Sequence, residues 1–354
     1  MDDSQTCWDI LPGVSRSFSL CIKLLPKPLD QQMMVSYLLY RALDTIEDSS
    51  ASVSKKRLMF RRFLRLLSRR RYDSGATCAC RDGMLASLDC TYEQTLLSNL
   101  ESVMRVFHSQ PTGVRRAIRH WGQVMAKGMY EFQKKRIKTF RDQDRYSYYV
   151  AGVVGYLFND LLYHNQIITD DVRRRLRRHA RRFGQALQKV NILRDVAHDV
   201  PSGRYYWPQA LLLKYRLNYD GLCKAENRAA AMKVLRAEIK NALAYLYSGM
   251  QYVLALPRDA LQVRMFCLIP LFMAIESYIK CIDNHEVFLD EKTVKISRIK
   301  VQEIVAKSGL WGTSNEKLVS WFMHSMARAD PLLAKSHYSR ELMGMRVAPA
   351  PSKR

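Results

Sequence analysis

An acidic pair that occurs twice at helical spacing constrains this chain more than any other feature. Asp44 and Asp48 are four residues apart, and so are Asp195 and Asp199. On a helix such residues lie one above the other on one face, where two carboxylates repel each other by roughly 0.2–0.5 kcal/mol. A cation is expected to offset this repulsion, and Mg2+ prefers carboxylate oxygens. If the two helices face each other in a bundle, the four carboxylates converge on several Mg2+ ions shared with a diphosphate.

The residues around each pair favour a metal site over a solvated helix face. Tyr37 and Arg41 precede the first pair on the same helical face, and Asn191 lies one turn before Asp195. One Asp-x-x-x-Asp pair would be weak evidence, because acidic helix faces are common at protein surfaces. Two copies, each with an arginine adjacent or one turn away, make divalent metal binding the better prediction.

Further segments resemble the squalene/phytoene synthase family, and within it they are most similar to the squalene synthases. These segments are residues 15–18, 146–157, 188–191, 203–209, 264–275 and 294–298. The resemblance covers most of residues 15–300. It implies an all-α fold, a single-domain helical bundle of the isoprenoid-synthase type with a central cavity, which we expect to span residues 1–340. It also implies the head-to-head condensation of two farnesyl diphosphates to squalene, through presqualene diphosphate, with reduction by NADPH.

The resemblance also assigns roles to individual residues. It implies binding of Mg2+ or Mn2+ by Asp44, Glu47, Asp48, Asn191, Asp195 and Asp199; diphosphate binding by Arg16, Arg41, Arg194 and Arg204; substrate contacts by Phe18, Tyr37 and Phe266; proton transfer or cation stabilisation by Tyr146; and NADPH binding by Lys295 and Arg298. Catalysis would then depend on Tyr146 and the four aspartates. The competing interpretations are a core tyrosine for Tyr146, a plain buried helix around Phe266, and an N-terminal packing arm around Arg16.

Two positions depart from the family pattern. Ser49 stands where family members often have a further acid, and Ser297 stands where a basic residue is expected, which puts the NADPH contact in doubt. No Gly-x-Gly-x-x-Gly motif follows a strand-like run, so a dinucleotide would have to bind a basic surface instead of a Rossmann fold. Phytoene or dehydrosqualene synthesis without NADPH is therefore an alternative, and a catalytically silent homologue is another.

The formal net charge of +24 requires an anionic partner or at least tolerance of one. Residues 55–71 contain nine Lys and Arg and no acid, and residues 173–182 contain seven arginines. A solvated face is the first interpretation of residues 55–71, and contact with acidic lipid is the next. Arginines alone would suggest a basic helical RNA-binding protein, the alternative from another class. We expect no nucleic acid, because the arginine run leads into the second acidic pair.

The composition favours a cytoplasmic protein, which we expect to be a monomer. The eight Cys form no Cys-x-x-Cys pair, which argues against a zinc site and a disulfide framework. The N-terminus lacks a basic region followed by an apolar run, so no signal peptide is predicted. The longest apolar candidate, residues 265–275, is short against the ~20 residues that a bilayer requires. Peripheral contact with an acidic membrane surface is the remaining membrane hypothesis.

Hydrophobic periodicity predicts most helices, and Gly and Pro predict most breaks. We expect helices over residues 30–48, 92–136 with a break at 111–113, 146–157, 170–200 and 227–254. In the third of these, Tyr146, Val150, Val153 and Leu157 should share a face, and Gly152 and Gly155 should allow close approach of a helix or an apolar ligand. Residues 1–29 are predicted to be turn-rich, residues 75–89 a loop, and residues 341–354 a disordered, Pro-rich basic tail.

Overall fold

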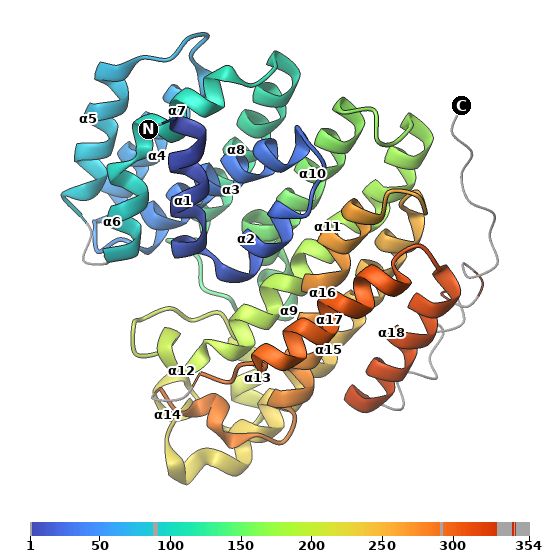
Figure 1. Cartoon of the computed structure of the whole chain (residues 1–354). Helices are drawn as coiled ribbons and strands as arrows, with labels where there is room; N and C mark the ends of the chain where they lie inside the picture. The colour runs from blue at the N-terminus through green and yellow to red at the C-terminus, as the bar shows by residue number, and fades with distance from the viewer. Residues whose placement is uncertain (1, 88–90, 291–292, 331–341, 343, 345–354) are drawn as a thin grey trace. The chain divides into compact units, whose positions relative to one another are not determined.

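Every regular element in the described part of the chain is a helix (Figure 1). The computed structural model describes residues 2–87, 91–290, 293–330, 342 and 344. The α-helices are α1 (Asp3–Val14), α2 (Arg16–Lys23), α3 (Leu29–Asp48), α4 (Val53–Ser68), α5 (Ser74–Leu85), α6 (Thr91–Ser98), α7 (Leu100–Ser109), α8 (Thr112–Phe132), α9 (Phe140–Ser147), α10 (Val153–His164), α11 (Asp170–Arg194), α12 (Val196–Asp199), α13 (Gln209–Lys214), α14 (Tyr219–Leu222), α15 (Arg228–Ala255), α16 (Leu261–Cys281), α17 (Arg298–Trp311) and α18 (Asn315–Ala329). The predicted all-α fold class is confirmed.

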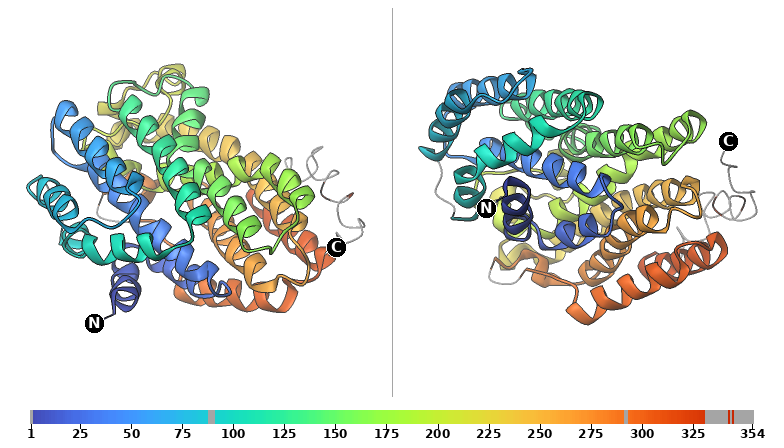
Figure 2. Two further views of the ribbon diagram at one scale, coloured as in Figure 1. Left: turned by 90° about the horizontal axis from the view of Figure 1, so that it is seen from above. Right: turned by 45° about the horizontal axis from the view of Figure 1, so that its top comes forward.

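The chain divides into two compact units. The first contains residues 1–135 and 156–168, and the second contains residues 136–155 and 169–354. In the first, α3 packs against α1, α2, α4, α6, α7 and α8. In the second, α11 packs against α15 and α16, and α16 also packs against α17 and α18 (Figure 2). One domain over residues 1–340 stays a prediction, and the predicted tail lies almost entirely outside the described residues.

Glycine allows the backbone of α11 to contact residues 151–155, which end the turn before α10 and begin α10 itself. A Cβ atom on Gly155 would overlap the carbonyl of Ala180, and one on Gly184 would overlap the carbonyl of Ala151. The predicted close approach of a neighbouring helix is therefore confirmed, and that helix is α11. Residues 148–152 form a π-helical turn, η1 (Tyr148–Gly152), so the helix predicted over residues 146–157 departs from α-helical geometry there. Tyr146, Val153 and Leu157 are buried and Val150 is half-buried.

Two segments predicted to be irregular are helical. Residues 1–29 contain α1 and α2, and most of residues 75–89 lies in α5. Each of these helices begins at a short polar cap, at Asp2, Ser15 and Asp73, whose side chain accepts a hydrogen bond from the first turn. α1 and α5 also bury a stripe at helical spacing: Cys7, Ile10 and Leu11 in α1, and Thr77, Cys80 and Met84 in α5. The glycines, prolines and small polar residues of these segments led to the prediction of turns and a loop, and the helix caps were not recognised.

Helix α16 is longer than the apolar run predicted for it. By length and composition it could cross a membrane, but 67% of its most apolar window is buried inside the protein. Arg264, near its start, is fully buried and donates to Asn315 Oδ1 at 2.6 Å. These contacts indicate a core helix of the second unit.

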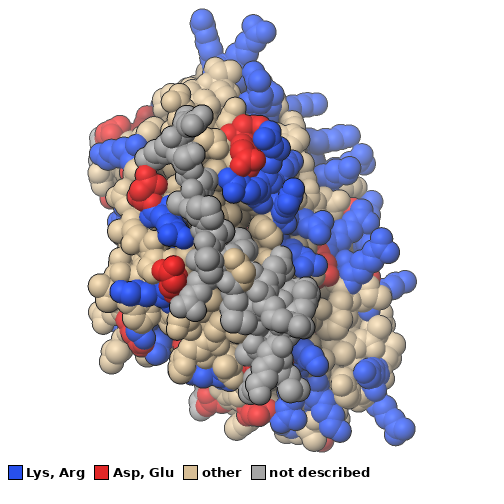
Figure 3. Space-filling view, turned by 90° about the vertical axis from the view of Figure 1, so that its right-hand side faces the viewer, with Lys and Arg blue, Asp and Glu red and all other residues tan. Residues whose placement is uncertain are grey.

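The positive charge of the protein faces water almost everywhere. Among the Lys and Arg residues whose burial the structure describes, only Lys56, Lys189 and Arg264 are buried. Figure 3 shows one face on which Lys and Arg side chains greatly outnumber Asp and Glu. The excess charge is therefore available to solution partners instead of being neutralised inside the fold.

A buried polar network joins α9, α11 and α15. The Lys189 ammonium donates to Gln143 and Asn241 at 2.7 Å each, and it lies 2.8 Å from Asp144. Gln143 in turn donates to the carboxylate of Glu238 at 3.1 Å. Glu238 is buried, and this loss of water raises its pKa to about 7, although the nearby Lys189 ammonium opposes the increase.

We predict that Glu238→Gln reduces the pH dependence of folding stability. The pKa of Glu238 is higher in the folded state than in the unfolded state, so protonation of this residue stabilises the fold. This stabilisation is complete below about pH 4.5 and is lost as pH rises through about 7. The wild type should lose roughly 1–3 kcal/mol more than the variant across this range. Urea unfolding at pH 4.5 and 8 measures this. The control Glu226→Gln, at an exposed position, should show the same pH dependence of unfolding free energy as the wild type. The same pH dependence in Glu238→Gln would contradict the prediction.

Candidate active site

The C-terminal half of α3 leaves only one stripe accessible to water. From residue 36 to residue 48, every position is buried except Tyr37, Arg41, Asp44 and Asp48. These positions follow the spacing i, i+4, i+7 and i+11, so they share one helical face. The predicted polar face around the first acidic pair is confirmed.

Arg41 connects this face to a second helix. Its guanidinium lies 3.6 Å from Asp44 and 3.2 Å from Glu93, which is on α6. Glu93 was not predicted from the sequence, since it belongs to no repeated motif and lies 52 residues from its partner. One arginine thus compensates two carboxylates.

The charge balance around Asp44 is incomplete. Loss of water raises the pKa of Asp44 to about 7, the Arg41 guanidinium lowers it, and the Asp48 carboxylate raises it again. Its side chain keeps 33% of its surface exposed, so a solute can reach it. A carboxylate in this position gains from an additional cation.

The end of α3 is held by a side chain of α4 and by the residue that caps the end of α8. The Lys56 ammonium donates to the carbonyl oxygen of Glu47 at 2.6 Å, and Gln133 Nε2 donates to it at 3.3 Å. A positive charge at a helix C-terminus opposes the negative end of the helix dipole. Ser49, at the position of the expected further acid, is buried and donates to the carbonyl of Ile46 at 3.0 Å. The end of the acidic motif is therefore fixed by direct contacts.

Two aromatic residues lie beside this face. The rings of Phe18 on α2 and Tyr37 on α3 stack at a centroid distance of 5.6 Å and an interplanar angle of 29°. Burial raises the pKa of Tyr37, and the side chain of Ser15 opposes this increase. The predicted pair of substrate-contacting aromatics is thus brought together. The Arg16 side chain lies outside the described residues.

The sequence analysis predicted one continuous helix through the second acidic pair, and this is wrong. The pair lies at the junction between two helices. α11 ends at Arg194, Asp195 is its C-cap, and the short α12 carries Asp199. The carbonyl of Ile192, which would bond residue 196 in an unbroken helix, accepts the indole N–H of Trp207 at 3.0 Å. The amide of Asp199 still donates to the carbonyl of Asp195 at 2.9 Å, so the two residues keep their helical relation.

Each carboxylate of this pair bonds one of the predicted arginines. Arg194 donates to Asp195 through Nε at 2.9 Å and Nη2 at 3.1 Å, a bidentate arrangement. Arg204 donates to Asp199 through Nε at 3.0 Å. Burial raises the pKa of Asp199 to about 6, and the Arg204 guanidinium opposes this increase. As on α3, arginines partly balance an acidic pair.

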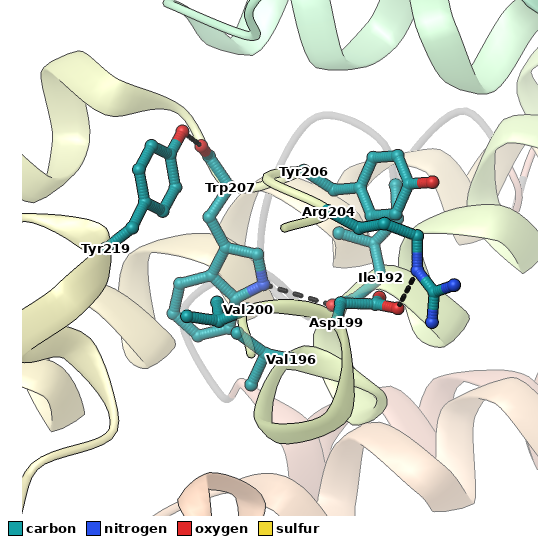
Figure 4. A pocket seen from close by; sticks show the side chains of 8 residues that line it. All are labelled: Ile192, Val196, Asp199, Val200, Arg204, Tyr206, Trp207 and Tyr219. Carbon is teal, nitrogen blue, oxygen red and sulfur yellow. Dashed lines mark hydrogen bonds and ion pairs between the residues drawn. The ribbon is translucent and has the colours of Figure 1, made fainter. Parts of the chain in front are cut away.

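Gly203 brings Arg204 back to Asp199. Gly203 has φ of 73°, its amide donates to the carbonyl of Val200 at 3.0 Å, and the amide of Arg204 donates to the carbonyl of Asp199 at 2.9 Å. These two bonds form a Schellman C-cap, in which the chain reverses at a left-handed residue. Figure 4 shows a pocket beside this turn that is too tight to hold a separate water molecule. It is lined by Ile192, Val196, Asp199, Val200, Arg204, Tyr206, Trp207 and Tyr219.

Tyr146 lies next to this pocket. It is buried, and its ring stacks on Tyr206 at 4.8 Å with an angle of 19°. Tyr206 was not predicted, although its place between Arg204 and Trp207 was a signal. Of the other predicted residues in this unit, Phe266 is buried, whereas Asn191, Lys295 and Arg298 are exposed.

The oxygen-rich donor set fits Mg2+ or Mn2+ better than a soft metal. Among the described residues, no group of three or more His, Cys, Asp or Glu could hold a metal ion by itself. Each unit instead offers one pair of carboxylates at helical spacing. The raised pKa of Asp44 and that of Asp199 indicate carboxylates that lack full compensation. Hard divalent ions that also bind substrate phosphates require few protein ligands from each side.

Comparison with known proteins assigns the chain to a family. The sequence profile described as squalene/phytoene synthase matches residues 11–300. The chain belongs to this family. It is 31% identical over 289 residues to squalene synthase of Rattus norvegicus, covering 80% of this chain but only 65% of the rat protein. Squalene synthase of Dictyostelium discoideum is 29% identical over 339 residues, covering 95% of this chain and 79% of that protein.

A solved structure supports the same assignment. The structure of TcSQS in complex with a ligand matches with a TM-score of 0.80 and 26% identity, covering 98% of this chain and 97% of that one. The isoprenoid-synthase helical fold of the squalene/phytoene synthase family is therefore the fold of this chain.

We predict that Gly203→Ala destabilises the junction more than Gly203→Asn does. Alanine at positive φ costs about 1 kcal/mol, whereas asparagine tolerates this region better. Nothing lies within 4 Å of a Cβ atom built on Gly203, so the effect should be conformational and not steric. Chemical unfolding measures the difference. Equal stability of the two variants would contradict the role of this residue in the cap.

Proposed function

We propose that the protein joins two farnesyl diphosphates head to head, through presqualene diphosphate, and reduces the product to squalene with NADPH. Membership of the squalene/phytoene synthase family supports a prenyl diphosphate substrate. Similarity to the rat and Dictyostelium squalene synthases favours squalene over related products. The observation that carries the proposal is the presence of two acidic pairs, each of which forms an ion pair with arginine near the C-terminal end of a helix.

In this proposal each acidic pair acts on substrate diphosphate through divalent ions. Asp44, Asp48, Asp195 and Asp199 would hold Mg2+ or Mn2+, with Glu47 and Asn191 in support. The ions supply positive charge that stabilises the departing diphosphate. Arg16, Arg41, Arg194 and Arg204 would bind diphosphate oxygens. The three arginines with described side chains each contact a carboxylate, which orients their guanidinium groups before substrate arrives.

Aromatic side chains would protect the allylic cation. The stacked pairs Phe18–Tyr37 and Tyr146–Tyr206 offer ring faces close to the two acidic pairs in their respective units. Ring faces attract cations, and exclusion of water prevents premature capture of the cation. Phe266 would contribute apolar surface. We propose Tyr146 for proton transfer or cation stabilisation because its ring stacks directly on a pocket residue.

The proposed NADPH contacts are Lys295 and Arg298. Both are exposed, Lys295 in the segment before α17 and Arg298 at its first residue, where cationic side chains can bind phosphate groups. Ser297 between them caps α17 by accepting a hydrogen bond from the amide of Lys300 at 3.2 Å, which explains a serine at this position. We further propose that the protein works as a cytoplasmic monomer with peripheral membrane contact.

We predict that Asp44→Asn and Asp195→Asn each lower turnover of farnesyl diphosphate by roughly 100-fold or more, because each removes a proposed metal ligand charge without changing shape. Steady-state turnover with saturating Mg2+ measures this effect. The exposed Asp220→Asn serves as the matched control and should retain full activity. Without Mg2+, the two variants should unfold at the same temperature as the wild type or higher, because they relieve repulsion. Near-normal turnover in either variant would refute the metal assignment.

We also predict the products. With farnesyl diphosphate and Mg2+, squalene should form only when NADPH is present, and presqualene diphosphate should accumulate without it. Only hydride can quench the final cation to squalene, whereas a desaturated product arises by proton loss. Mass spectrometry of the lipid extract separates these outcomes. Equal formation of dehydrosqualene in both reactions would refute the hydride step, and preference for geranylgeranyl diphosphate would indicate phytoene synthesis.

A further inference from the structure

The densest positive charge in the first unit lies on two antiparallel neighbours, α4 and α8. The Arg57 guanidinium of α4 lies 5.5 Å from the ring centre of Tyr130 near the end of α8. At the other end of the pair, Arg115 Nη1 donates to the carbonyl of Arg70 at 2.9 Å. α8 adds four Lys and Arg and a single acid to the nine basic residues of the stretch 55–71. Together they form a surface with almost no negative charge.

α4 separates its apolar and cationic side chains onto opposite faces. Met59, Phe60, Phe63, Leu66 and Leu67 are buried beneath the helix. On the outer face Lys55, Leu58, Arg61 and Arg65 are exposed, and they recur at helical spacing. We call these four residues the α4 outer face.

The cations of this face have no partner in the described chain. Lys55, Arg61 and Arg65 form no ion pair with any carboxylate of the described residues. Leu58 lies among them with 44% of its surface exposed, which is unusual for a leucine. An exposed leucine surrounded by cations without ion-pair partners is complementary to a surface that carries negative charge outside and apolar groups beneath.

The arginine-rich start of α11 differs in this respect. Arg174 pairs with Asp170 and Asp171, and Arg175 pairs with Asp171 at 2.7 Å. These pairs cancel part of the charge within one helical turn. α11 therefore provides a control surface of similar composition but lower free charge.

We propose that the α4 outer face binds the surface of a membrane containing acidic lipids. Lys55, Arg61 and Arg65 would bind headgroup phosphates, and Leu58 would enter the interface between headgroups. This inference rests on the proposed function in one respect, because a C30 hydrocarbon product must pass to a lipid phase. Each Lys or Arg near such a surface contributes about 1 kcal/mol.

The chemistry of the face favours lipid over RNA. Single-stranded nucleic acid is bound by exposed aromatic rings that stack on bases, together with cations. No Phe, Tyr or Trp of α4 or α8 is exposed, and all residues of both helices are described. Tyr130 is covered by the cations of Arg57 and Lys134, at 5.5 and 5.2 Å from its ring centre. The exposed apolar residue is instead aliphatic.

Vesicle flotation of the full chain, without substrate, tests the inference. We compare phosphatidylcholine vesicles with and without phosphatidylserine, at low and high salt. The wild type should bind only the acidic vesicles, and less at high salt because of screening. The triple variant Lys55→Gln, Arg61→Gln, Arg65→Gln should bind roughly 100-fold more weakly, since three contributions of about 1 kcal/mol are removed. Leu58→Ser should weaken binding at both salt concentrations.

The matched control removes the same charge from α11. The triple variant Arg174→Gln, Arg175→Gln, Arg178→Gln should change binding by less than about 3-fold, since two of these arginines already pair with Asp. Equal losses in both triple variants would overturn the assignment to α4. Failure of the wild type to bind acidic vesicles at low salt would overturn the inference altogether, as would RNA binding that depends on the α4 residues while vesicle binding does not.

Turnover measured in solution separates this inference from the proposed function. The α4 triple variant should condense farnesyl diphosphate at the wild-type rate, because the three residues lie on the opposite side of α4 from its buried contacts with the fold. Vesicle binding without any turnover would leave the surface assignment intact and refute the enzyme assignment. Turnover without vesicle binding would refute the surface assignment and leave the enzyme assignment intact.

Discussion

Charge compensation of paired carboxylates is the interaction on which the candidate site depends. Two aspartates one turn apart are unfavourable, and the protein places arginine beside each pair. Arg41 serves the pair on α3, and Arg194 and Arg204 serve the pair at the end of α11. Compensation is incomplete at Asp44 and Asp199, whose pKa values are raised to about 7 and about 6. A divalent ion would supply the positive charge that the arginines leave unbalanced at these two carboxylates.

The surrounding packing keeps these charges in place. Between residues 36 and 48 of α3, all positions except Tyr37, Arg41, Asp44 and Asp48 are buried, so the side chains that water reaches lie on one face. Gly184 on α11 and Gly155 on α10 allow the backbone of α11 to contact residues 151–155. The buried Lys189 then ties α9 and α15 to the same helix. Tyr146 on α9 is thereby held relative to the second acidic pair.

The sequence predicted the helical faces well and the helix ends poorly. The stripe that contains Arg41 and Asp44 follows from local geometry, because residues three and four apart on a helix always share a face. The end of α11 does not follow, because Trp207, 15 residues away, binds the carbonyl of Ile192. α5 was mistaken for a loop because small residues conceal its buried stripe, and only the packing of Cys80 and Met84 shows it.

By itself the sequence determined the family and, through it, the all-α class, because the motifs that carry the resemblance are short stretches of chain. It also determined the two acidic pairs, because spacing along one helix is a local property. Only the tertiary structure decided which residues complete these pairs. Glu93 joins Arg41 from 52 positions away, and Tyr206 stacks on Tyr146 from another segment. Such partners depend on which helices pack together and at what register. Those choices are made by burial over the whole unit, and a single stretch of sequence does not contain them.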